Sequence, residues 1–403
     1  MSLRERTLKG GLFLAGRQFL GIFLRLIAVL LITRIIGPYQ YGLFAACVGI
    51  FLYLQSFATW GIDVYLLRKP TDLTQEELNQ GFSLLLAIGL VFGCAMFVFR
   101  GALAGTGAWS LILGFIASNL ALCALTYHAT RLRPRLHWDR ALARQMLSYG
   151  LGYSSSIWVW QLRSLVNPLL VGRFAGAEGV GFVGLAIRIC EVLSFVKGAA
   201  WRIAMAALAK LGNDSERLRR SVTEGMRLQT LAVGLPLAGF AIVAPYVMPR
   251  VFGARWDPAL RVYPFIALSY LANSVFNLHS SVLYLLRRNW RVTAFHALHV
   301  LLFAGTAALL VPRMNILGYG WAEAVALASY ALVHYFVQRE IGSPAYAIAL
   351  IWCGAAACAF VFSAAGAPAL YFAPAVLLLP LLFRQERSSL HGYAQILLSR
   401  TSA

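Results

Sequence analysis

The chain has 403 residues, of which 60% are hydrophobic and 12% are charged, and its formal net charge at pH 7 is +20. Apolar runs of about 20 residues recur along its whole length, which excludes an ordinary soluble domain and is typical of a polytopic membrane protein. Because these runs are continuous and do not alternate with period two, they predict membrane helices and exclude a transmembrane barrel.

The expected fold class is therefore all-α, with about 12 transmembrane helices. The start of the chain, MSLRERTLKG, resembles the charged end of a signal peptide. The apolar stretch after it is too long for a signal peptide and lacks a cleavage site, so we expect a retained first helix. The hydropathy pattern predicts helices at residues 11–36, 41–66, 80–100, 107–129, 147–172, 178–205, 226–247, 260–285, 291–312, 318–337, 345–365 and 368–384.

Lys and Arg are distributed unevenly between the predicted loops. With a cytoplasmic N-terminus, the inner segments carry 22 of these residues and the outer segments carry six. Cytoplasmic loops are enriched in Lys and Arg, so the asymmetry predicts that both termini are cytoplasmic. Basic loops beside anionic lipid also account for most of the net charge. We expect no nucleic-acid partner, because the sequence contains no soluble basic domain.

When the 22 inner and six outer residues, some of them at helix ends, are subtracted from the 35 Lys and Arg residues, seven remain inside the predicted helices, where only three acids lie at comparable depth: Asp63, Glu191 and Glu323. A cation near the bilayer centre costs about 2.5 to 3.5 kcal/mol to insert, so it needs a partner or water. Arg17, Arg34 and Arg202 lie near helix ends and are expected to snorkel to the interface. The four central cations either form ion pairs and carbonyl contacts or line a wet cavity that receives an anion: Arg25, Arg163, Arg188 and Lys197.

The sixth predicted helix carries a charged stripe. Helical spacing places Arg188, Glu191 and Arg202 on one face, whereas Lys197 points to the opposite face. Arg188 and Glu191 are three residues apart and are predicted to pair, which leaves Arg202 less compensated.

Two further helices carry polar and aromatic residues at spacings of three and four. The fifth predicted helix has Ser156, Trp160, Arg163 and Asn167, and the eighth has Tyr270, Asn273, Asn277 and Tyr284. Arginine suits phosphate, while aromatic faces and amides suit sugars, so the stripes favour a phosphate-linked saccharide. Other anionic amphiphiles also suit a cationic cavity, and interhelical hydrogen bonding by Asn and Ser is the structural alternative.

These patterns give a predicted binding site with no catalytic residue and no metal. Its predicted cavity cations are Arg25, Arg163, Arg188, Lys197 and Arg202. Its predicted sugar contacts are Trp160, Asn167, Tyr270, Asn273 and Asn277.

A short motif recurs at two predicted outer turns. RIIGPYQYG at residues 34–42 and RFAGAEGVG at residues 173–181 share Arg and two Gly at matching offsets, and PRMNILGYG is a fainter third copy. Glycine at such a position permits a tight turn with positive φ. Chance recurrence in a glycine-rich chain is the alternative, but repeated hairpins are also how many transporters build their lobes.

A family resemblance follows from several stretches taken together. TRIIGPYQYGLF, RLRPRLHWDRALARQMLSYG, VGRFAGAEGVGFVGLAIRI, KLGNDSERLRR, GLPLAG and VFGARW resemble the polysaccharide-transport branch of the MOP superfamily. Its members are flippases of lipid-linked oligosaccharides and are similar in architecture to MATE exporters and lipid II flippases. The resemblance covers about residues 5 to 340, and the last two predicted helices match only in hydrophobicity.

The resemblance implies a fold and a function. It implies two pseudo-symmetric six-helix lobes, residues 1–220 and 221–403, that alternate access to a central cavity. It implies that an undecaprenyl-diphosphate-linked oligosaccharide crosses from the cytoplasmic to the outer leaflet of a bacterial inner membrane. A first-helix arginine is associated with diphosphate handling in related flippases, and only Arg25 lies at a comparable place. The expected partners are this lipid-linked oligosaccharide, membrane lipids, and a polysaccharide polymerase or glycosyltransferases.

Enzymatic interpretations have little support in the sequence. It lacks GxxxxGK[ST] and DxD motifs, so a transporter without a cofactor is expected. Two alternatives remain: a cation-coupled exporter of small amphiphiles, which would favour acidic cavity residues, and a scaffold for envelope-polysaccharide enzymes. Asp63 and Glu191 are the candidates for ion coupling. Four histidines are expected to be hydrogen-bonded core residues, with proton coupling as the alternative: His279, His296, His299 and His334.

Overall fold

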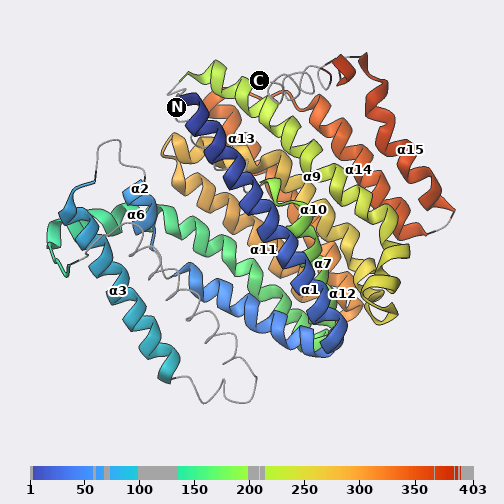
Figure 1. Cartoon of the computed structure of the whole chain (residues 1–403), viewed down its shortest axis with the longest axis horizontal. Coiled ribbons are helices and arrows are strands. Elements are labelled where there is room, and N and C mark those ends of the chain that lie inside the picture. The colour runs from blue at the N-terminus through green and yellow to red at the C-terminus, as the bar shows by residue number, and fades with distance from the viewer. Residues whose placement is uncertain are drawn as a thin grey trace.

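The computed structural model describes residues 3–57, 60–67, 73–98, 135–197, 208, 214–366, 368–384, 386–388 and 391, with side chains from residue 29 on apart from residues 63–64, 67 and 92–98. Every regular element in these ranges is a helix, and the described chain contains no strand (Figure 1). Six of its helical stretches are long and apolar enough to cross a membrane: Val29–Ser56, Arg140–Leu193, Ser215–Val251, Asn289–Met314, Ile316–Ile341 and Ala347–Ala365. The chain is an all-α polytopic membrane protein, as predicted.

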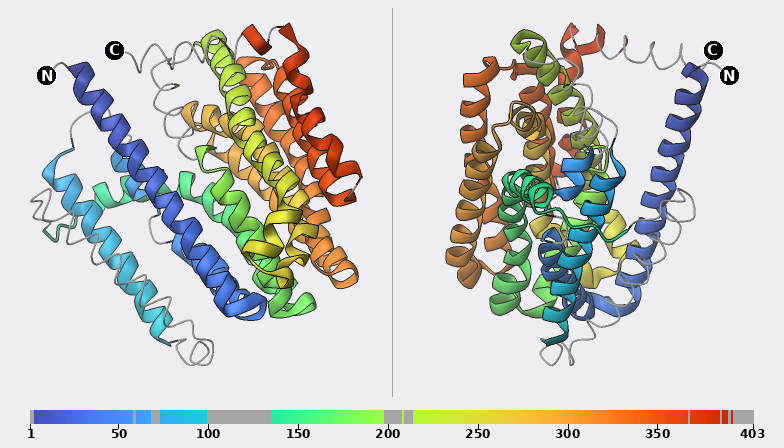
Figure 2. Two further views of the ribbon diagram at one scale, coloured as in Figure 1. Left: turned by 45° about the vertical axis from the view of Figure 1, so that its right-hand side comes forward. Right: turned by 90° about the vertical axis from the view of Figure 1, so that its left-hand side faces the viewer.

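The first element, α1 (Leu3–Ser56), is a helical hairpin. Gly37 interrupts it with φ of 75°, and the chain turns back there (Figure 2). A residue with a Cβ atom adopts this backbone region only with strain, so glycine fits the turn. The hairpin is followed by α2 (Ile62–Leu67) and α3 (Gln75–Val98). The tight turn predicted for the first copy of the repeat motif is confirmed.

A second hairpin follows the same plan. Asp139 caps α6 (Arg140–Gln161) by accepting hydrogen bonds from the first backbone N–H groups. The helix continues through η1 (Leu162–Leu165) and η2 (Asn167–Val171) into α7 (Gly172–Leu193), where Gly176 turns the chain with φ of 69°. This confirms the turn predicted for the second copy of the motif.

The two hairpins pack against each other backbone to backbone. A Cβ atom on Gly42 would lie 1.7 Å from the carbonyl oxygen of Ala177, and one on Gly181 would lie 2.3 Å from that of Pro38. In each contact, the glycine lies five residues after the turn glycine of its own hairpin. The carbonyl that it meets belongs to the residue directly after the turn glycine of the other hairpin. Such reciprocity is the property of a two-fold arrangement. The repeated motif therefore builds a two-fold contact between the hairpins.

The second half of the described chain begins with α9 (Ser215–Val251), capped by Asp214, and η3 (Ala254–Trp256). It continues with α10 (Pro258–Leu285), α11 (Asn289–Met314), α12 (Ile316–Ala326), η4 (Leu327–Ser329), α13 (Tyr330–Ile341) and α14 (Ala347–Ala365). In the faint third copy of the motif, the left-handed residue is Asn315, with φ of 51°. The predicted division into lobes of residues 1–220 and 221–403 stays a prediction.

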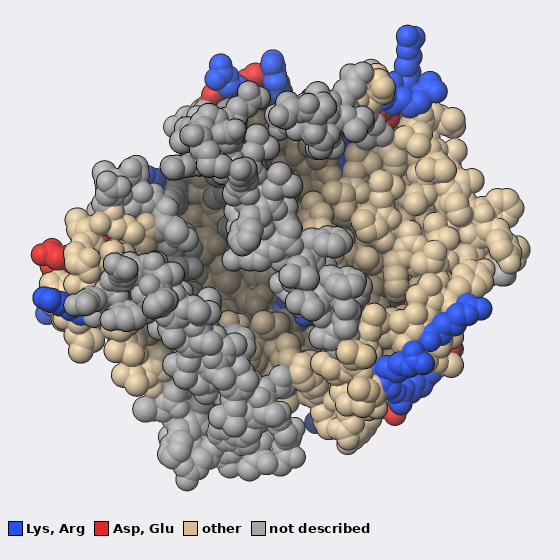
Figure 3. Space-filling model, viewed as in Figure 1, with Lys and Arg blue, Asp and Glu red and all other residues tan. Residues whose placement is uncertain are grey.

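The last apolar element is shorter than predicted. The prediction was a helix over residues 368–384, and the structure has one helical stretch over Ala369–Leu382 that consists of η5 (Ala369–Phe372), α15 (Ala373–Leu378) and η6 (Leu379–Leu382). On the face drawn in Figure 3, the charged side chains of the described residues lie mainly along the top, at the left edge and at the lower right, and the surface between them is largely uncharged. A lipid bilayer would surround the surface between the charged groups, because charged side chains of membrane proteins lie outside the hydrocarbon core.

A buried contact joins the two halves of the sequence beside the glycine turns. The Trp256 indole N–H donates to the carbonyl of Thr33 at 3.2 Å, and its ring packs edge-on against Tyr41, with centroids 5.5 Å apart. Arg255 donates to the carbonyl of Arg34, which lies in the last turn before Gly37. We call this contact, made by Thr33, Arg34, Arg255 and Trp256, the clasp.

Candidate functional site

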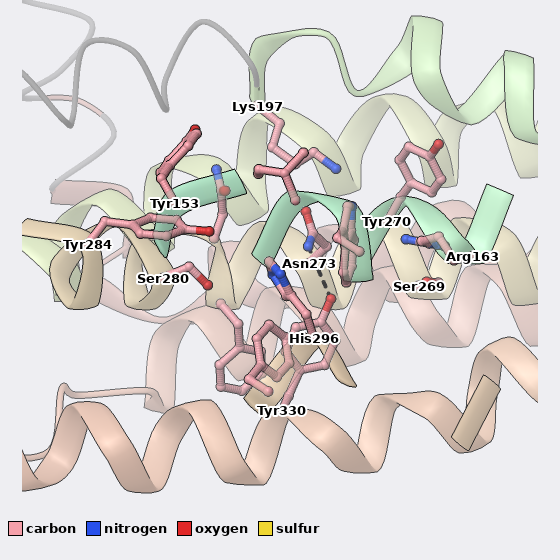
Figure 4. A pocket seen from close by; sticks show the side chains of 15 residues that line it. Tyr153, Arg163, Lys197, Ser269, Tyr270, Asn273, Ser280, Tyr284, His296 and Tyr330 are labelled. Atoms are coloured by element: carbon pink, nitrogen blue, oxygen red, sulfur yellow. Dashed lines mark hydrogen bonds between the residues drawn. The ribbon is translucent and has the colours of Figure 1, made fainter. Parts of the chain in front are cut away.

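Two cavities meet in the middle of the helical bundle. The smaller one, of about 300 Å³, is lined by Tyr153, Ile157, Trp160, Arg163, Lys197, Ser269, Tyr270, Asn273, Phe276, Asn277, Ser280, Tyr284, Phe295, His296 and Tyr330 (Figure 4). The larger one, of about 620 Å³, is lined by Val29, Ile32, Tyr41, Phe44, Ala45, Val48, Gly49, Leu52, Trp160, Gln161, Arg163, Ser164, Asn167, Pro168, Gly184, Ile187, Arg188, Glu191, Tyr270 and Tyr319. Trp160, Arg163 and Tyr270 belong to both walls.

Arg163 lies where the helix is irregular. It falls in the tight 3-10 turn η1, which is followed at once by the wide π turn η2. Pro168 lacks an N–H group, so the carbonyl of Ser164 has no helical partner four residues on. The Ser164 hydroxyl donates to the carbonyl of Gly49 in α1 at 3.0 Å and to that of Gln161 at 2.8 Å. Such irregular turns often occur at functional sites, and this one places Arg163 at the wall shared by the cavities.

Arg163 is paired with a buried acid from the other half of the sequence. Its Nη2 donates to both carboxylate oxygens of Glu323, at 2.9 and 3.2 Å. The Arg163 side chain is 20% exposed and that of Glu323 is 1% exposed. Tyr319 donates to the same carboxylate at 3.3 Å, and the guanidinium carbon lies 4.8 Å from the centre of the Trp160 ring. Arg163 thus keeps an exposed edge, whereas its partner has none.

Lys197 has no such partner. Its Nζ lies 4.6 Å from the ring centroid of Tyr270, a cation–π contact on the wall of the smaller cavity. Within the described residues, no Asp or Glu lies within ion-pair distance of this ammonium group. An ammonium group held only by an aromatic face can still accept an anion.

Arg188 and Glu191 line the larger cavity and form an ion pair of 2.9 Å. This confirms the predicted pairing. More than a third of each side chain is exposed, so the pair contributes little to stability. Lys197 follows the end of α7 at Leu193, so the orientation predicted for it from helical spacing stays a prediction.

The smaller cavity has a polar and aromatic wall. Asn273 donates to the hydroxyl of Tyr330 at 3.1 Å, drawn dashed in Figure 4. Asn277 donates to the side-chain oxygen of Gln229 at 3.0 Å. The amides therefore join helices, as the structural alternative supposed, and also face the cavity. Their carbonyl oxygens and the phenol groups can bond to hydroxylated ligands.

Asn167 lines the larger cavity. Its amide nitrogen donates to the carbonyl of Val180 at 3.3 Å, while its buried Oδ1 has no hydrogen-bond partner. Trp160 stacks near His296, with ring centroids 4.8 Å apart. The structure thus brings the predicted sugar-contact residues to two adjoining cavities.

The histidines are hydrogen-bonded, as predicted. His296 bonds to the backbone of Ser156 at 2.7 Å, and His299 bonds to the hydroxyl of Ser329 at 2.9 Å. His279 and His334 both contact the hydroxyl of Tyr346, at 2.5 and 2.7 Å. Among the described residues, no cluster of His, Cys, Asp and Glu could hold a metal ion.

Three predicted site residues lie outside the part of the chain whose side chains the structure describes. Arg202 lies outside the described residues, as do the side chains of Arg25 and Asp63. Sequence reasoning did not select Glu323 as a site residue, although the structure places it against Arg163. The sequence signal that could have selected Glu323 was a lone carboxylate in an apolar helix. Its partner Arg163 is 160 residues away in the sequence, so spacing could not identify the pair.

The comparisons with known proteins agree on one family. A family model described as polysaccharide biosynthesis protein matches residues 31–105 and 101–261, which is more than half of the chain. No solved structure matches the chain at a significant level.

Three curated relatives are similar to parts of the chain. The lipopolysaccharide biosynthesis protein WzxC of Escherichia coli is 22% identical in an alignment of 348 positions that covers 70% of this chain and 70% of that protein. The teichuronic acid biosynthesis protein TuaB of Bacillus subtilis is 23% identical over 54% of this chain and 44% of that protein. The succinoglycan biosynthesis transport protein ExoT of Rhizobium meliloti is 25% identical over 42% of this chain and 34% of that protein. The last two matches span less than half of those proteins.

Proposed function

The chain belongs to the family of polysaccharide biosynthesis proteins, and on that premise we propose that it is a flippase. It moves an undecaprenyl-diphosphate-linked oligosaccharide from the cytoplasmic to the outer leaflet of a bacterial inner membrane. Relatives named for polysaccharide biosynthesis and transport support a polysaccharide-related membrane transporter rather than an enzyme. The finer statement rests on the cavities.

One observation carries this proposal: two adjoining cavities share a cation. Arg163 lies in both walls, and Lys197 adds a second positive charge to the smaller cavity. A diphosphate needs positive charge and N–H donors, which these side chains supply. The sugars attached to it need aromatic faces and hydrogen-bonding groups, and Trp160, Asn273 and Tyr330 supply them in the same wall.

The proposed mechanism divides the lipid between protein and bilayer. The headgroup enters the cavity while the hydrocarbon tail stays in the membrane. Only the polar headgroup has a high free energy of transfer into the hydrocarbon of the bilayer. Rocking of the two lobes then exchanges access between the leaflets. A scaffold for other enzymes needs none of this, so loss of a cavity charge separates the two functions.

Lys197 offers a cleaner test than Arg163, because removing it leaves no buried carboxylate without a partner. We expect Lys197→Gln to lower glycan export in living cells about tenfold or more, since a hydrogen bond to a charged group contributes about 1.5 to 3 kcal/mol. Lipid-linked sugar should accumulate in the inner leaflet.

The matched control is Arg313→Gln, which removes an exposed cation whose guanidinium donates to the carbonyl of Leu309 and which lines neither cavity. It should leave export unchanged. Full export by Lys197→Gln at wild-type protein levels would contradict the proposal and favour the scaffold function.

A further inference from the structure

Glu323 is a buried acid whose negative charge is stabilised by a single described ion pair, the one with Arg163. It lies in α12 with 1% of its side chain exposed, and its described contacts are Arg163 and the hydroxyl of Tyr319. The function proposed above gives Arg163 to a phosphate and assigns nothing to Glu323. An unpaired carboxylate at such depth is costly, so the two events are coupled.

We propose that Glu323 is a proton-binding site linked to the anion site: when a diphosphate diester takes over Arg163, Glu323 takes up one proton. The inference rests on the proposed function, because it needs an anion at Arg163. The O–H bond forms on the carboxylate while its ion pair with the guanidinium is lost. Release of the anion restores the pair, and the proton leaves.

The balance of charge supports one proton per anion. Among the described residues of this site, the charged groups are Arg163, Lys197 and Glu323, whose sum is one positive charge. A diphosphate diester carries one negative charge on each phosphate and would leave the site negative. Protonation of Glu323 removes that excess, so the occupied site is neutral, which a low-dielectric interior favours.

Among the described residues, no other acid near the Arg163–Glu323 pair lacks a partner. The titratable and charged groups around the pair are Tyr319 on α12, Tyr270 on α10, Tyr330 on α13, His296 and His299 on α11, Arg188, Cys190 and Glu191 on α7, and Lys197 after the end of α7. Glu191 keeps its own partner at 2.9 Å. The histidines, and Lys197 if its amine is neutral in the empty site, are the other described groups that could bind a proton, and a variant of Glu323 separates them from it.

Calorimetry on the purified full chain in detergent tests the linkage. The probe is UDP-glucose, a soluble diphosphate diester that bears a sugar and whose phosphates do not titrate near neutral pH. Titrations in two buffers with different ionisation enthalpies give the number of protons bound. We expect uptake to approach one proton per probe, with affinity rising up to tenfold for each pH unit lowered.

Glu323→Gln keeps the shape of the side chain but cannot take up a proton. It should bind the probe about tenfold more tightly at neutral pH, with no proton uptake and no dependence on pH. Glu340→Gln is the matched control, because Glu340 forms an ion pair with Arg288 and lines neither cavity, and it should keep the wild-type proton count. Undiminished uptake in Glu323→Gln would overturn the inference and assign the proton to a histidine or to Lys197.

The wild-type measurement stands even if Glu323→Gln does not fold. Binding of the probe without proton uptake would overturn this inference and leave the proposed function intact. No binding of UDP-glucose, or of a short-chain polyprenyl-diphosphate sugar, would overturn the proposed function and the inference with it.

Discussion

Arg163 and Lys197 are both cavity cations, but among the described residues only Arg163 has a carboxylate partner. Removing one member of a buried ion pair costs about 3 to 5 kcal/mol, because the other charge stays buried. We therefore expect Arg163→Gln to lower the melting temperature of the purified protein strongly and Lys197→Gln to lower it little.

The double variant Arg163→Gln with Glu323→Gln should recover most of the lost stability, since no lone charge remains. Thermal unfolding in detergent, followed by circular dichroism, measures all three variants. Equal melting temperatures for Arg163→Gln and the double variant would show that the pair is not what stabilises this site.

Sequence reasoning at the residue scale succeeded where partners are close in the chain. Arg188 and Glu191 are three residues apart on one helix, so their pairing follows from helical geometry. The partner of Arg163 is on a helix 160 residues away, and periodicity cannot specify which helices touch. Local charge patterns therefore named Arg163, Arg188 and Lys197, which line the cavities, while the acid that pairs with Arg163 was identified only from the tertiary structure.

At the scale of elements, the repeat motif contributes the contact between the two hairpins. Gly42 in α1 packs on the backbone of α7, where a Cβ atom would lie 1.7 Å from a carbonyl oxygen. Backbone cannot move aside as a flexible side chain can. We expect Gly42→Ala to destabilise the protein by about 1 to 3 kcal/mol through overpacking.

The matched control is Gly305→Ala in α11, where nothing lies within 4 Å of the added Cβ. Alanine there should stabilise the helix by about 0.5 to 1 kcal/mol. The yield of folded protein and its melting temperature measure both variants. A Gly42→Ala protein as stable as the control would contradict the backbone contact.

The last apolar element shows where hydropathy misleads. Residues 368–384 are apolar enough for a span, but Pro368, Pro374 and Pro380 recur every six residues. Each proline lacks an N–H group and clashes with the preceding turn, so the helical stretch Ala369–Leu382 is short and has 3-10 turns at both ends. Hydropathy records only how apolar the segment is, whereas the prolines affect the length and the regularity of the helix.

At the scale of the whole molecule, the clasp joins the two halves of the sequence at the end that carries the glycine turns. Trp256 is fully buried there, and Arg255 bonds to the last turn before Gly37. The motifs RIIGPYQYG and VFGARW, which the sequence suggested separately, thus meet in one contact. Their meeting could not be derived from spacing, because 217 residues separate Arg34 from Val251.

If the proposed lobes rock, this end must open for the headgroup to leave. Arg255 and Arg34 lie close enough for a hydrogen bond, so cysteines at these two positions can be joined by a short thiol-specific reagent that forms reducible disulfides. We expect this cross-link between Arg34→Cys and Arg255→Cys to abolish glycan export, because a covalent link would hold the two halves together at this end. A chain with its six native cysteines replaced provides the background. Reduction of the cross-link should restore export.

The control joins two helices within the second half. Arg288 on α11 and Glu340 on α13 form an ion pair of 3.0 Å, so Arg288→Cys with Glu340→Cys accepts the same reagent. This pair does not cross between the proposed lobes, and its cross-link should leave export unchanged. Export that survives a complete cross-link of the clasp would show that the glycine-turn end stays closed during transport. The headgroup would then have to leave through another opening, and rocking about the Arg163 site would not be the mechanism.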